Sequence, residues 1–218
     1  MKTFSKMTRD VDLVVFDLDG TLVDSREDIA AAVAVAMQEV GAPGCDKQAV
    51  FPFIGRPLID VFLGLLPASL AHRAEDAAQA YRAYYLVHCA DSTRLYPGVM
   101  ACLDRLDGIA KAIATTKKTF MAVELIEKLG LANRFVLVHG SDGIPHKPDP
   151  TVINQVLDKT GYTAARCWMV GDTVYDIQAA KAAGMPVCAV TYGIGNRDDL
   201  VAQKPDLLLD TLGDFFVD

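Results

Sequence analysis

The stretch VDLVVFDLDGT, residues 11–21, decides the fold of this chain. Its first half is an almost unbroken apolar run, Val11–Phe16, which is typical of a β-strand covered on both faces. Its second half is polar, because Asp17 and Asp19 follow the run and the Asp-Gly pair at 19–20 favours a turn. The stretch therefore predicts a buried strand that ends in two carboxylates.

Further β-rich runs follow along the chain and alternate with longer helical patterns. The runs are Ile109–Ala114, Phe135–His139, Cys167–Val170, Val187–Val190 and Leu207–Leu209. Strand–helix–strand alternation implies right-handed crossovers. We therefore expect the α/β class, with a parallel, doubly wound, Rossmann-like sheet.

One interval, residues 25–92, breaks this alternation because it shows helical patterns only. Ser25 and Asp28 predict a capping box at the start of its first helix, and Gly41 ends that helix. A helical block of this size after the first strand predicts a cap domain over the carboxyl edge of the sheet. We expect two domains: an α/β catalytic core (1–24 and 93–218) and a helical cap (25–92).

The composition argues against several classes of protein. The chain has 218 residues, 51% of them hydrophobic, which argues against disorder. A net charge of -7 argues against a nucleic acid or an anionic membrane as partner. The five cysteines are scattered, residues 1–10 have no apolar signal region, and the longest apolar stretch, 29–37, is too short to span a bilayer. We expect a cytoplasmic protein that does not bind membranes.

Polar residues gather where the predicted strands end. Asp17 and Asp19 follow the first strand, Thr115 and Thr116 follow the second, and Asp172 follows a later one, with Asp176 one helical turn further on. Ligands bind outside the carboxyl ends of the strands in doubly wound sheets. We therefore expect these residues to converge, although they are far apart in the sequence.

Taken singly, each of these acids fits an ordinary turn or helix cap. Gathered together, Asp17, Asp19 and Asp172 would repel one another by several kcal/mol. Such a cluster persists when a cation neutralises it. Oxygen ligands without a nearby His or Cys select a hard ion, so the pattern favours Mg²⁺.

A lysine and a hydroxyl complete a set suited to phosphoryl transfer. Lys147 lies between two prolines in HKPDP, residues 146–150, and Thr115 offers a hydroxyl at a strand end. A carboxylate can accept a phosphoryl group covalently while a metal and cationic or hydroxyl groups hold the other oxygens. Alone, Lys147 would be an ordinary loop lysine and Thr115 a strand-terminal β-former, so the interpretation depends on the whole set.

Four motifs in this order resemble those of the haloacid dehalogenase superfamily of phosphohydrolases: DLDGT at 17–21, Thr115, KPDP at 147–150 and GDTVYD at 171–176. Within it, the segments at 20–41 and 190–195 (VTYGIG) resemble the phosphoglycolate phosphatase type, which also has a helical cap between the first two motifs. The resemblance spans almost the whole chain. It implies a Mg²⁺-dependent phosphatase that hydrolyses a small phosphomonoester through an aspartyl-phosphate.

The resemblance also implies a role for each acidic residue. Asp17 would be the nucleophile, and Asp19 would protonate the leaving oxygen and then deprotonate the attacking water. The Asp17 carboxylate, the Asp19 main-chain carbonyl and Asp172 would hold Mg²⁺. Asp176 would lie in the outer shell of the metal and orient its water.

The remaining implied site residues would bind the substrate. Thr115 and Lys147 would hold phosphoryl oxygens, and Thr116 would donate through its backbone N–H. Members of the phosphoglycolate type have Asn-Lys-Pro after the second-motif Thr, whereas Thr116-Lys117-Lys118 stands here, so a side-chain contact to phosphate is altered. In the cap, Arg56 fits a substrate anion and equally an exposed loop.

Several alternatives stay open. A pyrophosphatase has a similar cap, and a sugar-phosphate mutase is disfavoured because Gly171-Asp172 is not an acidic pair. Asp19 argues against a dehalogenase, and the setting of Lys47, the single lysine of the insert, against a phosphonatase. A phospho-acceptor signalling module or a silent binding protein belongs to a different class. The expected partner is a small phosphorylated metabolite, and the sequence allows a monomer or a homodimer.

Overall fold

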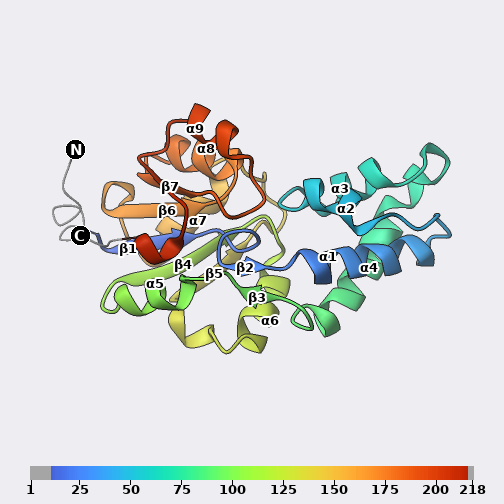
Figure 1. Cartoon of the computed structure of the whole chain (residues 1–218), viewed down its shortest axis with the longest axis horizontal. Helices are drawn as coiled ribbons and strands as arrows, with labels where there is room; N and C mark the ends of the chain where they lie inside the picture. Colours follow the sequence, from blue (N-terminus) through green and yellow to red (C-terminus); the bar gives the residue numbers. More distant parts are fainter. Residues whose placement is uncertain (1–10, 216–218) are drawn as a thin grey trace.

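The computed structural model describes residues 11–215 and shows an α/β sheet with a helical lobe at one end (Figure 1). The described strands form a six-stranded sheet in the order β5-β4-β1-β6-β7-β8, and every neighbouring pair is parallel. The strands are β1 (Leu13–Phe16), β4 (Ala110–Thr115), β5 (Leu137–Gly140), β6 (Cys167–Gly171), β7 (Val187–Val190) and β8 (Leu207–Leu209). The predicted run 11–21 therefore supplies a central strand.

Alternation along β1 divides the core between the two faces of the sheet. Val14 and Phe16 pack with α5 (Val99–Arg105) and α6 (Thr119–Lys128). Leu13 and Val15 pack on the other face, with α7 (Thr151–Thr160), α8 (Val174–Ala182) and α9 (Arg197–Ala202). Helices on both faces of a parallel sheet confirm the doubly wound α/β fold.

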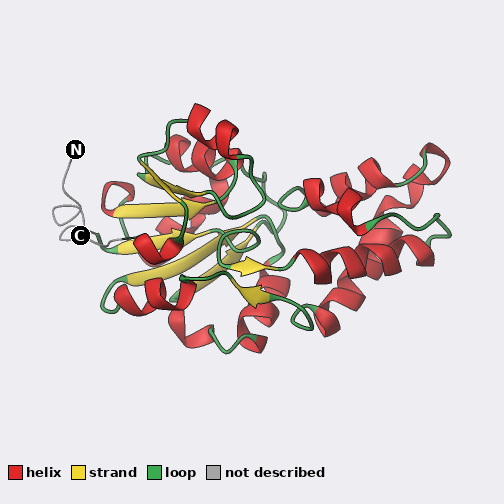
Figure 2. Cartoon of the chain, viewed as in Figure 1, coloured by secondary structure: helices red, strands yellow, loops and turns green. Residues whose placement is uncertain are grey.

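The helical lobe lies beyond the carboxyl ends of the strands (Figure 2). It contains α1 (Arg26–Glu39), α2 (Lys47–Val50), α3 (Leu58–Leu65) and α4 (Ala74–His88), with the 3₁₀ turns η3 (Phe51–Phe53) and η4 (Ala68–Arg73). Its aromatic core includes Phe62 edge-on to Tyr81, which stacks on Tyr85 at a centroid distance of 5.4 Å. The domain boundaries at 24/25 and 92/93 stay a prediction.

A short antiparallel pair, β2 (Val23–Asp24) with β3 (Arg94–Leu95), joins the lobe to the sheet. These two-residue strands are absent from the sequence prediction because they are too short to show a hydrophobic period.

The predicted capping box at the start of α1 is wrong. The Ser25 hydroxyl donates to Asp19 Oδ1 (2.5 Å) and does not cap α1. The Asp28 carboxylate accepts from the backbone N–H groups of Ser92 and Thr93. Both side chains therefore connect the start of α1 to other segments.

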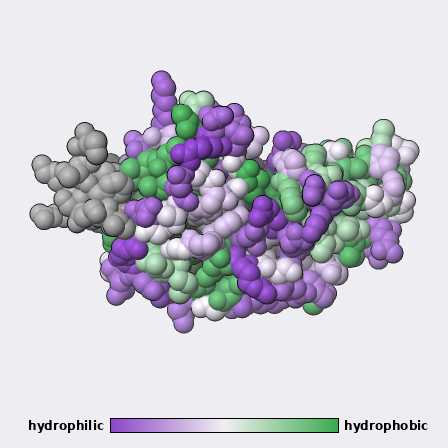
Figure 3. All heavy atoms as spheres, viewed as in Figure 1, coloured by the Kyte–Doolittle hydropathy of each residue, from purple (hydrophilic) through white to green (hydrophobic). Residues whose placement is uncertain are grey.

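On the face drawn in Figure 3, hydrophilic and hydrophobic residues are interspersed over both the sheet and the helical lobe. Within residues 11–215, no helix has the length and apolar character that crossing a bilayer requires. All five cysteines are free thiols.

Candidate active site

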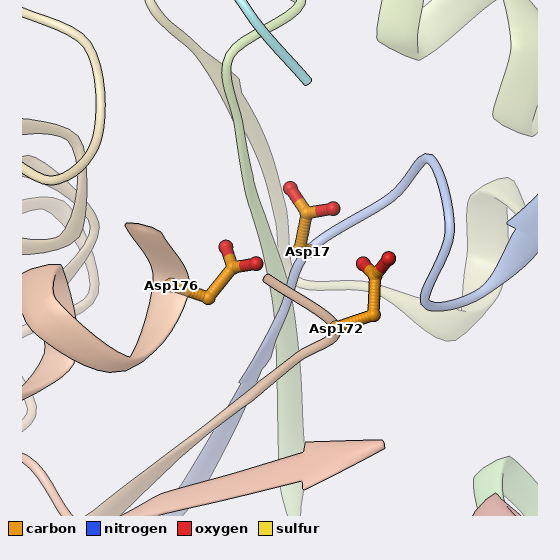
Figure 4. A group of neighbouring side chains, drawn as sticks. All are labelled: Asp17, Asp172 and Asp176. Atoms are coloured by element: carbon orange, nitrogen blue, oxygen red, sulfur yellow. The ribbon is translucent and has the colours of Figure 1, made fainter. Parts of the chain in front are cut away.

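Three carboxylates converge at the carboxyl edge of the sheet (Figure 4). Asp17 follows β1, Asp172 follows β6, and Asp176 lies in the first turn of α8. Each offers an oxygen, and these oxygens all lie within 4.8 Å of one another. The predicted convergence of residues far apart in sequence is therefore confirmed for these three.

Lys147 supplies one positive charge inside this cluster. Its Nζ donates to Asp17 Oδ1 (2.5 Å) and to Asp176 Oδ1 (2.6 Å), and only 4% of its side chain is exposed. Asp176 Oδ2 in turn accepts from the Thr173 hydroxyl (2.6 Å), while the Thr173 side chain caps α8. The position of Asp176 is thus fixed by its helix and by Lys147.

Asp172 is held by donors of its own. The Thr21 hydroxyl donates to Oδ1 (2.8 Å), and the Ile194 N–H donates to Oδ2 (2.7 Å). A Cβ at Gly20 or Gly193 would collide with this carboxylate, so both turns approach it as closely as glycine permits. The backbone of the VTYGIG segment, residues 190–195, therefore forms one wall of the Asp172 site.

Burial and the closeness of the carboxylates to one another make the ionised forms of this cluster energetically unfavourable. Burial raises the pKa of Asp172 to about 7, and the neighbouring Asp176 adds to the effect. Burial likewise raises the pKa of Asp17 well above its ordinary value, although Lys147 opposes this. Burial disfavours the ammonium form of Lys147, but Asp17 and Asp176 outweigh it and raise its pKa. The cluster therefore lacks positive charge.

The residues present fit a divalent cation. Asp17, Asp172 and Asp176 carry three negative charges when ionised, and Lys147 offsets one of them. Their donor atoms are all carboxylate oxygens, the ligands that hard ions prefer. A divalent ion would balance the remaining charge.

Asp19 lies apart from this cluster and has two other partners. Ser25 donates to Oδ1, and Lys117 Nζ lies 3.2 Å from Oδ2. Asp19 is 8% exposed and borders the same cavity as Asp17.

That cavity, of about 670 Å³, lies between the sheet edge and the helical lobe. Every predicted site residue except the fully buried Asp172 lines it: Asp17, Asp19, Arg56, Thr115, Thr116, Lys147 and Asp176. Arg56 reaches it from the lobe, with its guanidinium 5.1 Å from the centre of the Phe53 ring. The structure thus gathers the predicted residues, while their roles stay predictions.

Two residues at this site, Lys117 and Arg82, were not predicted from the sequence. Lys117 pairs with Asp19 and donates to the Tyr85 hydroxyl of α4 (2.9 Å). Arg82, also on α4, lines the cavity; its Nη1 donates to Glu75 (2.9 Å), and its buried Nε has no partner within residues 11–215. Lys117 lies two residues after the second-motif Thr115, which was a usable signal, whereas nothing in the helical pattern of α4 distinguishes Arg82.

Comparison with known proteins agrees with the fold. The family model for haloacid dehalogenase-like hydrolases matches residues 14–190. A phosphoglycolate phosphatase of Vibrio parahaemolyticus is 33% identical over 94% of this chain and 95% of its own. A probable phosphatase of Dickeya dadantii, IndB, is 36% identical over 93% and 90%. The structure of a haloacid dehalogenase-like hydrolase from Streptococcus pneumoniae superposes with a TM-score of 0.83, at 30% identity over 94% and 96%.

These relatives, together with the parallel sheet and the carboxylate cluster at its carboxyl edge, identify the chain as an α/β enzyme of the phosphoric monoester hydrolase class. The chain belongs to the haloacid dehalogenase-like hydrolase family.

Proposed function

We propose that this enzyme is a Mg²⁺-dependent phosphatase that hydrolyses a small phosphomonoester of the phosphoglycolate type through an aspartyl-phosphate. The carrying observation is the placement of Asp17 beside Lys147, at the edge of a cavity that Asp19 also lines. Lys147 engages Asp17 Oδ1, and Oδ2 accepts no hydrogen bond from the described chain, so Oδ2 is free to attack phosphorus.

The reaction would take place in two displacements. Asp17 Oδ2 attacks phosphorus, the ester P–O bond breaks, and Asp19 gives its proton to the leaving oxygen. Asp19 then accepts a proton from water as the water attacks phosphorus, and the bond to Asp17 breaks. Inorganic phosphate leaves, and both carboxyl groups return to their starting states.

The metal would be held by the Asp17 carboxylate, the Asp19 main-chain carbonyl and Asp172. When bound, Mg²⁺ supplies a Lewis acid that neutralises phosphoryl charge. Asp176 would lie in the outer shell of the metal and orient its water. The charge balance of the cluster supports a divalent ion at this place.

The phosphoryl group and the rest of the substrate would contact different walls of the cavity. Thr115, at the end of β4, and Thr116 and Lys147 would hold phosphoryl oxygens. Arg56 would meet a carboxylate or second anion on the substrate. We expect the enzyme to act on this metabolite in the cytoplasm and to bind neither nucleic acid nor membranes.

Phosphate release from a panel of phosphomonoesters, phosphoglycolate included, tests this proposal when it is measured with Mg²⁺ and with EDTA. We expect metal-dependent release that favours phosphoglycolate. Asp17→Asn should abolish release, because an amide cannot form the phosphoenzyme. Asp19→Asn should lose turnover and keep metal binding, because its ligand atom is a backbone carbonyl.

The other outcomes point to distinct alternatives. Selectivity for another ester would keep the mechanism and change the substrate. Release from pyrophosphate alone would indicate a pyrophosphatase, and isomerisation of a sugar phosphate would indicate a mutase. An Asp19→Asn variant with most of its activity would refute the acid–base assignment. No reaction with any of these compounds would favour a non-catalytic binding protein.

A further inference from the structure

Lys117 is a buried lysine whose charge is directed at Asp19. Its Nζ lies 3.2 Å from Asp19 Oδ2, with 7% of the lysine side chain and 10% of the aspartate side chain exposed. An ammonium group buried to this extent is costly unless it is paired and hydrogen-bonded. Asp19 supplies the charge partner.

The helical lobe supplies the other partner of this lysine. Tyr85, fully buried in α4, accepts a hydrogen bond from Lys117 Nζ (2.9 Å), and its ring centre lies 4.1 Å from the same nitrogen. Tyr85 is itself fixed by stacking on Tyr81. Lys117 therefore connects a residue of the sheet edge, Asp19, to an aromatic ring of the lobe.

The backbone of Lys117 is held as firmly as its side chain. Its N–H donates to the Thr115 hydroxyl (3.2 Å), and its carbonyl accepts from the Ser141 N–H (3.2 Å). A Cβ at Gly140 would collide with this carbonyl, so β5 packs directly against it. Both ends of the side chain are thus defined, which is what a group that orients another residue requires.

We propose that Lys117 is a positioning residue for Asp19, and that Tyr85 of α4 holds Lys117 in the orientation this requires. The inference rests on the proposed function, in which Asp19 transfers the protons. Ser25 and Lys117 each engage one oxygen of the carboxylate, so the two together set its orientation. The contact with Asp19 assigns Lys117 to acid–base positioning, and not to the binding of phosphate.

The dependence of rate on the leaving group separates this role from a structural one. An alkyl phosphate such as phosphoglycolate needs a proton on its leaving oxygen, whereas 4-nitrophenyl phosphate expels a stable anion without one. The constant kcat/KM covers the steps up to the departure of the leaving group, while kcat also includes the attack of water. A misplaced Asp19 should therefore lower kcat/KM for the alkyl ester selectively and lower kcat for both esters.

The test compares Lys117→Met with the full-length wild type on these two esters. General acid catalysis contributes about 10²- to 10⁴-fold, and we expect loss of positioning to remove about 10- to 100-fold from kcat/KM for phosphoglycolate. The kcat/KM for 4-nitrophenyl phosphate should fall less than about threefold. Lys117→Arg should recover part of the alkyl activity, and Tyr85→Phe should show a smaller loss of the same selectivity.

Lys128→Met is the matched control, because Lys128 also joins the core to α4 but does so away from Asp19. Its Nζ donates to the carbonyls of Leu86 (2.7 Å) and Val87 (2.8 Å). We expect this variant to keep the wild-type ratio of the two kcat/KM values. An equal ratio change in Lys128→Met would overturn the inference, because docking of the lobe alone would then explain the effect.

Equal losses for both esters in Lys117→Met would also overturn the inference and indicate phosphate binding or a structural role. Thermal denaturation would show whether this variant folds, and if it does not, Lys117→Arg and Tyr85→Phe decide the question by the same ratio. A wild-type enzyme that releases phosphate from neither ester would refute the proposed function itself. A wild-type enzyme active on both, with no change of ratio in the variants, would refute the role of Lys117 alone.

Discussion

In the metal-free protein, the buried carboxyl of Asp172 should make folding stability fall as pH rises. Burial and Asp176 raise the pKa of this group from 3.8 to about 7, so the folded state binds its proton more tightly than the unfolded state does. The stabilising contribution is therefore fully present below about pH 4 and is lost as pH rises through about 7. This direction is opposite to that of a salt-bridged surface aspartate.

The size of the effect follows from the same pKa. One pKa unit corresponds to about 1.4 kcal/mol, so the whole contribution of Asp172 is roughly 4 kcal/mol, of which roughly 2 to 3 kcal/mol is lost between pH 5 and pH 8. In a chain of this length, 1 kcal/mol shifts the melting temperature by about 2 to 4 °C. We expect the metal-free protein to melt roughly 5 to 10 °C lower at pH 8 than at pH 5 on this account.

Thermal denaturation in EDTA at pH 5 and pH 8 measures this difference, and Asp172→Asn isolates it. The amide takes up no proton, so the pH-dependent difference should shrink by roughly 2 to 3 kcal/mol in this variant. Asp158→Asn, a change at an exposed position of α7, is the control and should leave the difference intact. Mg²⁺ needs the ionised carboxylate, so its stabilising effect should be larger at pH 8 than at pH 5.

Two results would refute this reasoning. One is equal stability of the metal-free wild type at pH 5 and pH 8, together with equal stability of the Asp172→Asn variant at these two pH values. The other is a Mg²⁺-induced rise in melting temperature that is no larger at pH 8 than at pH 5.

Three further predictions concern the walls of the site. Thr21→Val removes the hydroxyl bound to Asp172; a hydrogen bond to a charged group contributes about 1.5 to 3 kcal/mol, so calorimetry should show Mg²⁺ affinity at least about tenfold weaker, and an unchanged affinity would contradict this. Gly193→Ala places a Cβ against the Asp172 carboxylate and should cost about 1 to 3 kcal/mol of stability in denaturant titrations; wild-type stability would show that the turn can move. Arg56→Gln and Arg82→Gln should each lower kcat/KM for phosphoglycolate about tenfold relative to an alkyl phosphate that lacks the carboxylate. A variant with an unchanged ratio would show that its arginine does not bind the substrate carboxylate.

The strands of the large sheet were predictable because each is a short, mostly apolar run that can be recognised in the sequence. A strand buried on both faces is mostly apolar, and the buried strand Val187–Val190 has the predicted bounds. The half-buried edge strand Leu207–Leu209 is also apolar throughout and has the predicted bounds. The two-residue strands β2 and β3 have no such pattern. The capping box at Ser25 failed because a serine hydroxyl can serve either its own helix or a distant acceptor, and Asp19 lies within reach only after folding.

The site residues also fall into those that could be predicted from the sequence and those that could not. Residues at strand ends were predictable as a group, because parallel strands deliver their carboxyl ends to one edge. The contacts of Lys117 with Tyr85 and of Arg82 with the cavity depend on how α4 lies over that edge. Helical periodicity says which face of α4 is apolar and does not say which polar group of that helix meets the sheet. The packing of the helical lobe on the sheet determines which polar groups of α4 reach the site.

The electrostatics of the site still favours a bound cation, although lysines offset part of the repulsion among the aspartates. Repulsion among gathered aspartates was the reason to expect a cation, and the structure places Lys147 between Asp17 and Asp176, which relieves part of it. Asp19 is paired separately with Lys117. Four carboxylates and two lysines leave a deficit of two positive charges, and the neighbouring Asp176 adds to the rise that burial causes in the pKa of Asp172. A divalent ion would supply both charges, whereas protons would supply them only at the expense of the nucleophile and the metal ligand.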